Sequence, residues 1–272
     1  MFRMKWLVMF ILLLLSAKGF STPALGTLTM CVDHYPPLQI LRENGEVVGE
    51  NVAVTKRLVS QLNFELSFTK NIPFGRCMQW LKEGKVDIMG GVLDTNSRRQ
   101  FAHLFLYKDV TIKQFFVHSD GPQISTFSDL KGLRIGVIRG VKHFKQFDNA
   151  RGDHFNKVEL LSLQAAFGML NKGRLDAVLC TDRHGHRVIE QNSNFTNNIV
   201  ASNYSENHDT QVYIALSKRS AFARYVSDFE KAAQQLYTNK IFAKTIDDFK
   251  KQYPQYYQQT VTTDKTEDSR KL

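Results

Sequence analysis

One pattern of apolar and polar positions occurs twice in the chain. Residues 78–91 and residues 167–180 both contain Leu-x-x-Gly-(Lys/Arg)-x-Asp followed by an apolar run. Gly84 and Gly173 suit the left-handed backbone conformation that ends a helix. The apolar run after each glycine is too short for a second helix and suits a buried strand. The two copies therefore predict two similar α/β lobes rather than one large sheet.

The ends of these two predicted strands indicate where a site should lie. The apolar runs finish at residues 90–91 (Gly-Gly) and at residues 180–181 (Cys-Thr). In open α/β sheets, ligands bind beyond the carboxyl ends of the strands. We therefore expect a site between the two lobes.

Local patterns predict the remaining elements. They predict strands at 28–32, 64–68, 111–117, 134–138 and 211–216, and helices from Asn51 as cap and over 73–84, 222–237 and 240–249. Residues 44–45 (Asn-Gly) predict a hairpin turn. Asp94 or Thr95 suits the cap of a short helix whose N–H groups face the cleft and suit an anion. Residues 191–207 are polar and rich in Asn.

The first residues have the layout of a secretory signal peptide. Arg3 and Lys5 precede an apolar run over 6–15, and small residues follow as far as Ser21. The run is too short to span a bilayer comfortably, so we interpret residues 1–21 as a cleaved signal peptide rather than as an uncleaved membrane anchor. The chain is therefore expected to be exported.

Composition and charge refine this interpretation. The 272 residues are 43% apolar and 23% charged, which is typical of a globular protein with one large or two ordinary domains. The formal charge of +10 becomes +7 when the three residues Arg3, Lys5 and Lys18 leave with the signal peptide. The remaining basic residues are scattered, which favours a solvated basic surface that attracts anions and argues against a nucleic-acid interface.

Three cysteines enter an oxidising compartment. Cys31 and Cys77 lie in the same half of the chain and are a candidate disulfide, which leaves Cys180 unpaired, although geometry decides such a pairing and the sequence leaves it open. No Cys/His spacing indicates zinc. We interpret His184 and His186 as ordinary loop residues and expect no metal and no cofactor.

Several short motifs stand in a characteristic order along the chain. They are 33–37 (Asp-His-Tyr-Pro-Pro), 43–45 (Glu-Asn-Gly) with Gly49, 84–87 (Gly-Lys-Val-Asp), 95–98 (Thr-Asn-Ser-Arg), 129–132 (Asp-Leu-Lys-Gly) and 173–177 (Gly-Arg-Leu-Asp-Ala). In this order and spacing they resemble the family 3 extracellular solute-binding proteins, the periplasmic receptors of amino-acid importers. The resemblance covers almost the whole mature chain.

This resemblance implies an α/β protein with the two-lobed periplasmic-binding-protein type II fold, in which two hinge-crossing strands join the lobes and the ligand cleft lies between them. Residues 24–110 plus 214–258 would form lobe 1, residues 111–213 lobe 2, and residues 259–272 a disordered polar tail. The implied protein is a periplasmic binding protein, not an enzyme, that closes on a small polar or carboxylated solute such as an amino acid. Its expected partner is an inner-membrane ABC permease, and it is expected to be a monomer.

The resemblance also implies the roles of individual residues. The aromatic ring before the proline pair, Tyr35, would pack on the ligand. Arg98, the arginine of the Thr-x-x-Arg motif, would hold the ligand's carboxylate. Gly91 would offer backbone contacts, and Thr181 or Asp182 would supply the polar partner from the opposite lobe.

Some positions depart from the pattern of amino-acid binders. Such binders usually carry Ser or Thr where this chain has Leu93, and Thr where it has Val141. The Asp that usually pairs with the ligand's amino group is Thr181 here, with Asp182 one place later. These departures weaken the assignment to a standard α-amino acid without weakening the fold.

Two other functions stay open from the sequence. The same two-lobed protein can dock on a membrane signalling receptor, and only the identity of the partner separates this function from import. A cleft enzyme such as a dehydratase would need a carboxylate or a histidine with an altered pKa. Asp33, His34 and Asp182 are the candidates near the cleft, and each has a simpler role in a loop or in binding.

Overall fold

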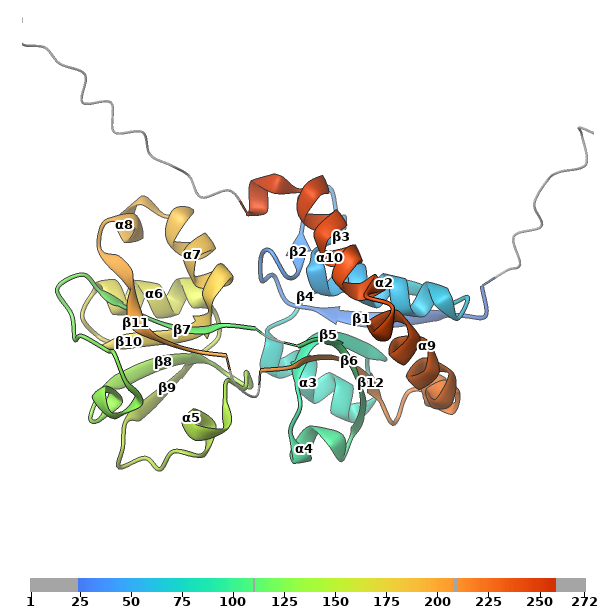
Figure 1. Ribbon diagram of the computed structural model, residues 1–272, viewed down its shortest axis with the longest axis horizontal. Helices are drawn as coiled ribbons and strands as arrows, with labels where there is room; N and C mark the ends of the chain where they lie inside the picture. The colour runs from blue at the N-terminus through green and yellow to red at the C-terminus, as the bar shows by residue number, and fades with distance from the viewer. Residues whose placement is uncertain (1–23, 110, 208–209, 258–272) are drawn as a thin grey trace, which may run out of the picture.

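Two α/β units lie side by side, each around its own five-stranded sheet (Figure 1). The structure is a computed structural model that describes residues 24–109, 111–207 and 210–257. The predicted signal peptide and polar tail lie outside the described residues. The prediction of two α/β lobes is confirmed. We call the unit that contains the first strand lobe 1 and the other unit lobe 2.

The sheet of lobe 1 has the strand order β4-β1-β5-β12-β6. Its strands are β1 (Thr27–Val32), β4 (Glu65–Asn71), β5 (Ile88–Leu93), β6 (Ala102–Lys108) and β12 (Val212–Ser217). β1 runs parallel to β4 and β5, whereas β12 is antiparallel to β5 and β6. The predicted hairpin is present as β2 (Ile40–Leu41) and β3 (Val47–Val48).

The sheet of lobe 2 has the strand order β11-β7-β10-β8-β9. Its strands are β7 (Lys113–His118), β8 (Arg134–Ile138), β9 (Asn156–Leu160), β10 (Ala177–Thr181) and β11 (Ile199–Glu206). The chain crosses between the lobes twice, from β6 to β7 and from β11 to β12 (Figure 1). The exact lobe boundaries stay a prediction.

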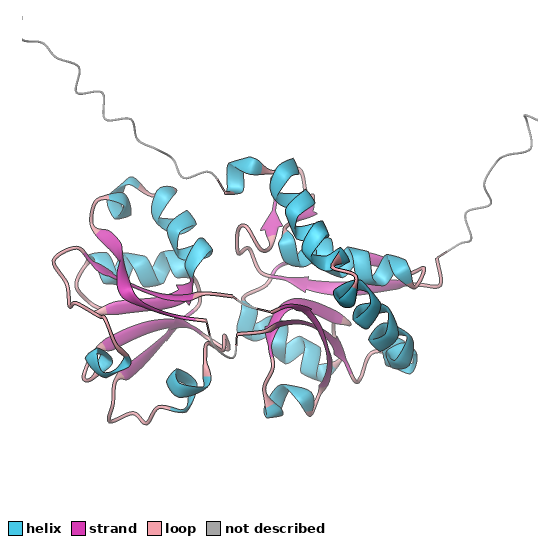
Figure 2. Cartoon of the chain, in the orientation of Figure 1, coloured by secondary structure: helices cyan, strands magenta, loops and turns pink. Residues whose placement is uncertain are grey.

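Helices cover both faces of each sheet (Figure 2). Lobe 1 has α2 (Glu50–Gln61), α3 (Phe74–Glu83), α4 (Asn96–Arg99), α9 (Val226–Thr238) and α10 (Ile241–Gln252), with 3-10 turns at Ala221–Tyr225 and Pro254–Tyr256. Lobe 2 has α5 (Lys145–Asn149), α6 (Leu163–Asn171), α7 (Asp182–Glu190) and α8 (Ser193–Thr196), with a 3-10 turn at Phe127–Leu130.

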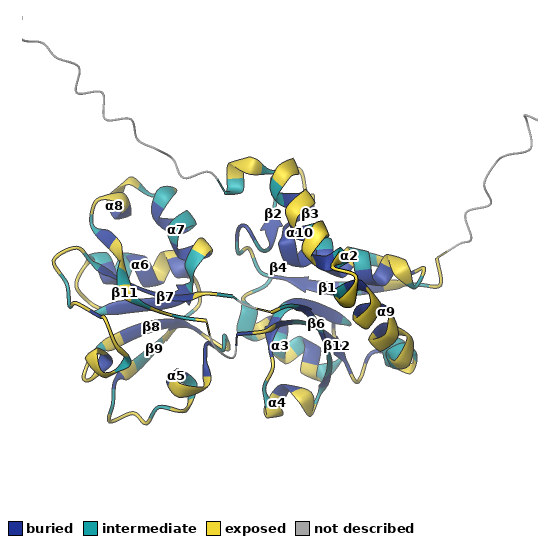
Figure 3. Ribbon diagram, in the orientation of Figure 1, coloured by how far each residue is buried: buried dark blue, intermediate teal, exposed yellow. Residues whose placement is uncertain are grey.

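Each lobe has its own apolar core on both faces of its sheet. In lobe 1, α2, α9 and α10 pack on one face around Leu58 and Phe229, and α3 packs on the other around Leu81. In lobe 2, Phe167 and Phe147 lie in the two corresponding clusters. Figure 3 shows the strands mostly buried and the outer helix surfaces exposed. The two lobes therefore have separate apolar cores.

The repeated motif has the same structure in both lobes. Gly84 ends α3 with φ 76°, and Gly173 follows α6 with φ 65°, as predicted for left-handed helix ends. The carboxylate of Asp87 accepts a hydrogen bond from the backbone N–H of Thr29 (2.8 Å), and the carboxylate of Asp176 accepts one from Arg134 (2.7 Å). The aspartate of each copy therefore fixes the backbone of a neighbouring strand.

The prediction that Asn51 caps a helix is wrong. α2 begins two residues earlier than such a cap implies, at Glu50 with Gly49 at the N-cap, and Asn51 is buried within its first turn. Its side-chain oxygen accepts a hydrogen bond from the Tyr107 hydroxyl (2.6 Å). A residue type typical of caps thus serves here as the buried partner of a tyrosine.

The polar stretch that ends lobe 2 contains a strand that the sequence pattern did not predict. Residues 199–206 form β11, the edge strand that pairs with β7. Most of its side chains are partly or fully exposed, so the apolar signal of a buried strand is missing.

The cysteines are arranged as the sequence allowed. Cys31 on β1 and Cys77 on α3 form a disulfide with an S–S distance of 2.00 Å, and Cys180 is a buried free thiol. The disulfide therefore joins α3 to the sheet of lobe 1. Within the described residues, no helix has both the length and the apolar character needed to cross a membrane.

Candidate functional site

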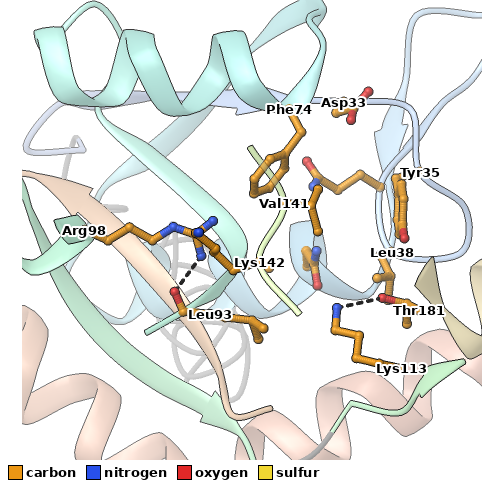
Figure 4. Close-up of a pocket in the computed structure, with 13 residues that line it drawn as sticks. Asp33, Tyr35, Leu38, Phe74, Leu93, Arg98, Lys113, Val141, Lys142 and Thr181 are labelled. Atoms are coloured by element: carbon orange, nitrogen blue, oxygen red, sulfur yellow. Dashed lines mark hydrogen bonds between the residues drawn. The ribbon is translucent and has the colours of Figure 1, made fainter. Parts of the chain in front are cut away.

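A small cavity of about 50 Å³ lies between the two lobes (Figure 4). Four of the predicted site residues line it: Tyr35, Gly91 and Arg98 from lobe 1, and Thr181 from lobe 2. The cavity has room for a few water-sized groups as it stands. The carboxyl ends of β1, β5 and β10 meet around it, which is the position expected for ligands in such sheets.

Arg98 is held in this cavity by the short helix α4. Thr95 caps the helix, since its hydroxyl accepts a hydrogen bond from the Arg98 backbone N–H (3.2 Å). The Arg98 guanidinium donates to the Leu93 carbonyl (2.6 Å) and, across the cleft, to the Gly140 carbonyl (3.0 Å). Burial lowers the pKa of Arg98 to about 10, so it stays charged at neutral pH.

The neighbouring Arg99 has a different environment. It is exposed and its guanidinium binds the Asp94 carboxylate through Nε (2.8 Å). Arg98 is 5% exposed and forms no ion pair with any residue that the structure describes. Of the two adjacent arginines, Arg98 is therefore the one available to an anion in the cavity.

Lys113 is a cavity residue that the sequence analysis did not predict. It is the first residue of β7, it is 4% exposed, and its ammonium donates to the Thr181 hydroxyl (3.3 Å). Burial lowers the pKa of Lys113 to about 8. The available signal was a lysine inside an apolar strand pattern, next to a predicted hinge.

Asp33 brings the only carboxyl group among the described residues that line the cavity. It follows β1 and accepts a hydrogen bond from the backbone N–H of Phe74, the first residue of α3. Burial raises the pKa of Asp33 to about 7, and the Phe74 N–H opposes this shift. The carboxyl group is therefore only partly ionised at neutral pH.

Tyr35 and His184 connect the lobes beside the cavity. The two rings stack with centroids 3.4 Å apart, and Tyr35 reaches the apolar cluster of lobe 2. The Nδ1 of His184 donates a hydrogen bond to the carbonyl of Pro36 in lobe 1. Burial lowers the pKa of His184 to about 3, so the ring is neutral.

Asp182 lies outside the cavity lining. Its carboxylate contacts Nδ1 of His186 (3.2 Å) on the same helix and raises the pKa of that histidine. Gly91, by contrast, lines the cavity with φ 82°, and a Cβ there would lie 2.3 Å from the Asn51 amide nitrogen. Only glycine fits this position without strain.

A buried carboxylate forms a second connection between the lobes. Glu50 on α2 has a side chain that is 1% exposed and lies 3.1 Å from Lys108 and 3.4 Å from Arg183 of lobe 2. The hydroxyl of Tyr257 also donates to Glu50 (2.9 Å). Together with the Tyr35–His184 stack, these contacts hold the lobes against each other on one side of the cavity.

Two α/β lobes around a cavity, joined by two connections, define the class of hinged binding proteins that close around a ligand. The chain belongs to the bacterial extracellular solute-binding proteins, family 3, whose family model matches residues 28–265. The predicted family and fold class are confirmed.

Curated relatives match part of the chain. It is 31% identical over 150 residues to the ABC transporter arginine-binding protein 1 of Escherichia coli strain K12, covering 53% of this chain and 58% of that protein. It is 28% identical over 149 residues to the histidine-binding periplasmic protein of Salmonella typhimurium, covering 53% and 55%. The chain thus spans little more than half the length of the curated relatives it matches.

Solved structures share the fold over a longer stretch. An ancestral arginine-binding protein bound to arginine has a TM-score of 0.67 at 21% identity, over 86% of this chain and 99% of that one. A histidine kinase sensor domain with similarity to periplasmic binding proteins has a TM-score of 0.66 at 20% identity, over 82% and 95%. At these identities the likeness shows the fold alone.

Proposed function

We propose that this protein is a periplasmic receptor that closes on a small carboxylated solute and delivers it to an ABC permease of the inner membrane. The observation that carries the proposal is Arg98, a buried charged guanidinium that faces a cavity between two lobes and forms no ion pair among the described residues. A buried charge without a counter-ion is costly. A ligand carboxylate would compensate it through two parallel hydrogen bonds.

The other lining residues have supporting roles in this proposal. Tyr35 limits the cavity with its ring, and the backbone of Gly91 approaches the ligand closely. The hydroxyl of Thr181 supplies the polar group of lobe 2, while Asp182 holds His186. Ligand contacts to both lobes would favour the closed state over an open one, because a ligand shifts an equilibrium by its difference in affinity for the two states.

Export, transport and the absence of catalysis belong to the same proposal. The curated relatives are named as binding proteins of ABC transport or of the periplasm, and residues 1–21 have the layout of a signal peptide. Among the described lining residues, Asp33 has the one carboxyl group, with a pKa near neutral, and its bond to the N–H of Phe74 gives it a positioning role at a helix terminus.

Replacing Arg98 with Ala is expected to weaken binding of the carboxylated solute about thirtyfold, because a hydrogen-bonded charge contributes about 2 kcal/mol. The ligand is found by thermal unfolding of the signal-free protein against amino acids, small carboxylates, polyamines and short peptides, since a bound ligand raises the melting temperature. Titration calorimetry then compares the affinities.

The matched control is Arg99→Ala, which removes the adjacent arginine that Asp94 already neutralises. It should bind the solute as the wild type does. Equal losses in both variants, or a stabilising ligand whose affinity does not depend on Arg98, would contradict the proposed role of the cavity.

A further inference from the structure

We propose that the solute is a small dicarboxylate, with one carboxylate bound by Arg98 and the second by Lys113. This inference rests on the proposed function and specifies its ligand. It starts from two buried cations, one from each lobe, that line the same cavity. In Figure 4 the two side chains approach this space from different sides.

The cavity lining carries more positive than negative charge, although Asp148, outside the lining, also acts on Arg98 and Lys113. Neither Arg98 nor Lys113 forms an ion pair within the described part of the chain, and Lys142, which is half-buried, adds a third positive charge to the lining. Asp33 is the one acidic residue among the described lining residues. Burying cations without anions is unfavourable, so the lining favours a ligand with two negative charges.

Both cations keep hydrogen-bond donors for such a ligand. A guanidinium has five N–H groups, and the guanidinium of Arg98 donates to the neutral carbonyls of Leu93 and Gly140. An ammonium has three N–H groups, and Lys113 uses one for the Thr181 hydroxyl. The planar fork of Arg98 suits a bidentate carboxylate, and Lys113 acts as a point charge for the second.

The same lining disfavours cationic solutes and ordinary α-amino acids. The carboxylate of Asp182 faces His186 instead of the cavity, so the acceptors left for an α-ammonium group are Asp33, which is only partly ionised at neutral pH, and the buried Oε1 of Gln39. An arginine or histidine side chain would add positive charge next to Lys113 and Lys142. The small volume also fits a short ligand better than a long side chain. The chain therefore differs in ligand class from relatives named for arginine and histidine.

The test compares two ligands that differ in one charge. Succinate carries two carboxylates, and succinamate carries one carboxylate and one neutral amide of nearly the same shape. We expect the signal-free protein to bind succinate at least tenfold more tightly than succinamate in titration calorimetry, with malonate and glutarate included to vary the length. In Lys113→Met this preference should fall to about twofold or less, while Arg98→Ala weakens both ligands.

Two further measurements show whether a lost preference in Lys113→Met comes from the missing charge in the cavity. Lys113→Met removes a buried unpaired cation, so its ligand-free melting temperature should equal or exceed that of the wild type, which shows that the variant folds. Lys131→Met removes an exposed lysine outside the cavity lining and should keep the wild-type preference.

The outcomes separate this inference from the proposed function. Equal affinity for succinate and succinamate, or an equal loss of both in Lys113→Met, overturns the dicarboxylate inference while the carboxylate receptor stands. Arg98-dependent binding of glutamine or another amino acid, without binding of any dicarboxylate, does the same. If no carboxylated solute binds and Arg98→Ala changes nothing, both proposals fail.

Discussion

Replacing both Cys31 and Cys77 with Ala is expected to lower the free energy of unfolding by about 4 kcal/mol. The disulfide closes a loop with a sequence separation of 46, and the loop-entropy relation gives about this value for a loop of that length. Both cysteines are at most 1% exposed, so the substitution also removes packed sulfur atoms. The difference in the free energy of unfolding is measured by urea titration in buffers that contain neither an oxidant nor a reducing agent.

The buried thiol of Cys180 provides the control. Cys180→Ala removes a sulfur atom of the same size from a core position without opening a cross-link, and it should cost only about 1 kcal/mol. A reducing agent should destabilise the wild type and Cys180→Ala alike and leave the double variant unchanged. A double variant that unfolds within 1 kcal/mol of the wild type would contradict the assigned role of the disulfide.

The two lobes could be predicted from the sequence because the residue patterns that indicate their helices and strands are local. A glycine with positive φ at a helix end, followed by a short apolar run, has few structural alternatives, and the motif around Gly84 and Gly173 therefore predicted a helix and a strand twice. Thr95 followed the same logic as the cap of α4, and that cap also fixes the position of Arg98. The role of Arg98 itself was predicted from the Thr-x-x-Arg motif of the resemblance.

The rest of the site depends on contacts between distant segments. Lys113 looks like an ordinary lysine in a strand until the fold brings it beside Thr181, 68 residues away. Thr181 and Asp182 are adjacent in sequence, yet one lines the cavity and the other turns to His186, because α7 begins at Asp182. No local pattern contains this information. The charge balance from which we infer the ligand class is therefore visible only in the structure.

At acidic pH, His184 is expected to lower the free energy of unfolding. This is the last of the large effects that we expect. Its pKa is about 3 in the folded protein and 6.5 in an exposed histidine. Between these values the unfolded chain binds a proton that the folded protein does not, so the free energy of unfolding falls as the pH falls below 6.5. From about pH 7.5 to pH 4.5 the loss from this group is about 2–3 kcal/mol.

Other groups modify this pH dependence, so the prediction is made for a difference between variants. Asp33 has the opposite sign, because its pKa is raised from 3.8 to about 7 and the folded protein binds the extra proton over that range. His143, whose pKa burial also lowers, adds to the loss in acid. Substituting His184 alone leaves both of these contributions in place.

In His184→Phe the ring stack on Tyr35 can persist, but the titrating group is gone. We expect its free energy of unfolding to fall about 2–3 kcal/mol less than that of the wild type over the same pH range, in urea titrations at each pH. Tyr35→Phe changes the other ring and adds no group that titrates below pH 8, so its curve should run parallel to that of the wild type. If the His184→Phe curve were also parallel, the histidine would already be solvated, and the Tyr35–His184 stack would not close the lobes in solution.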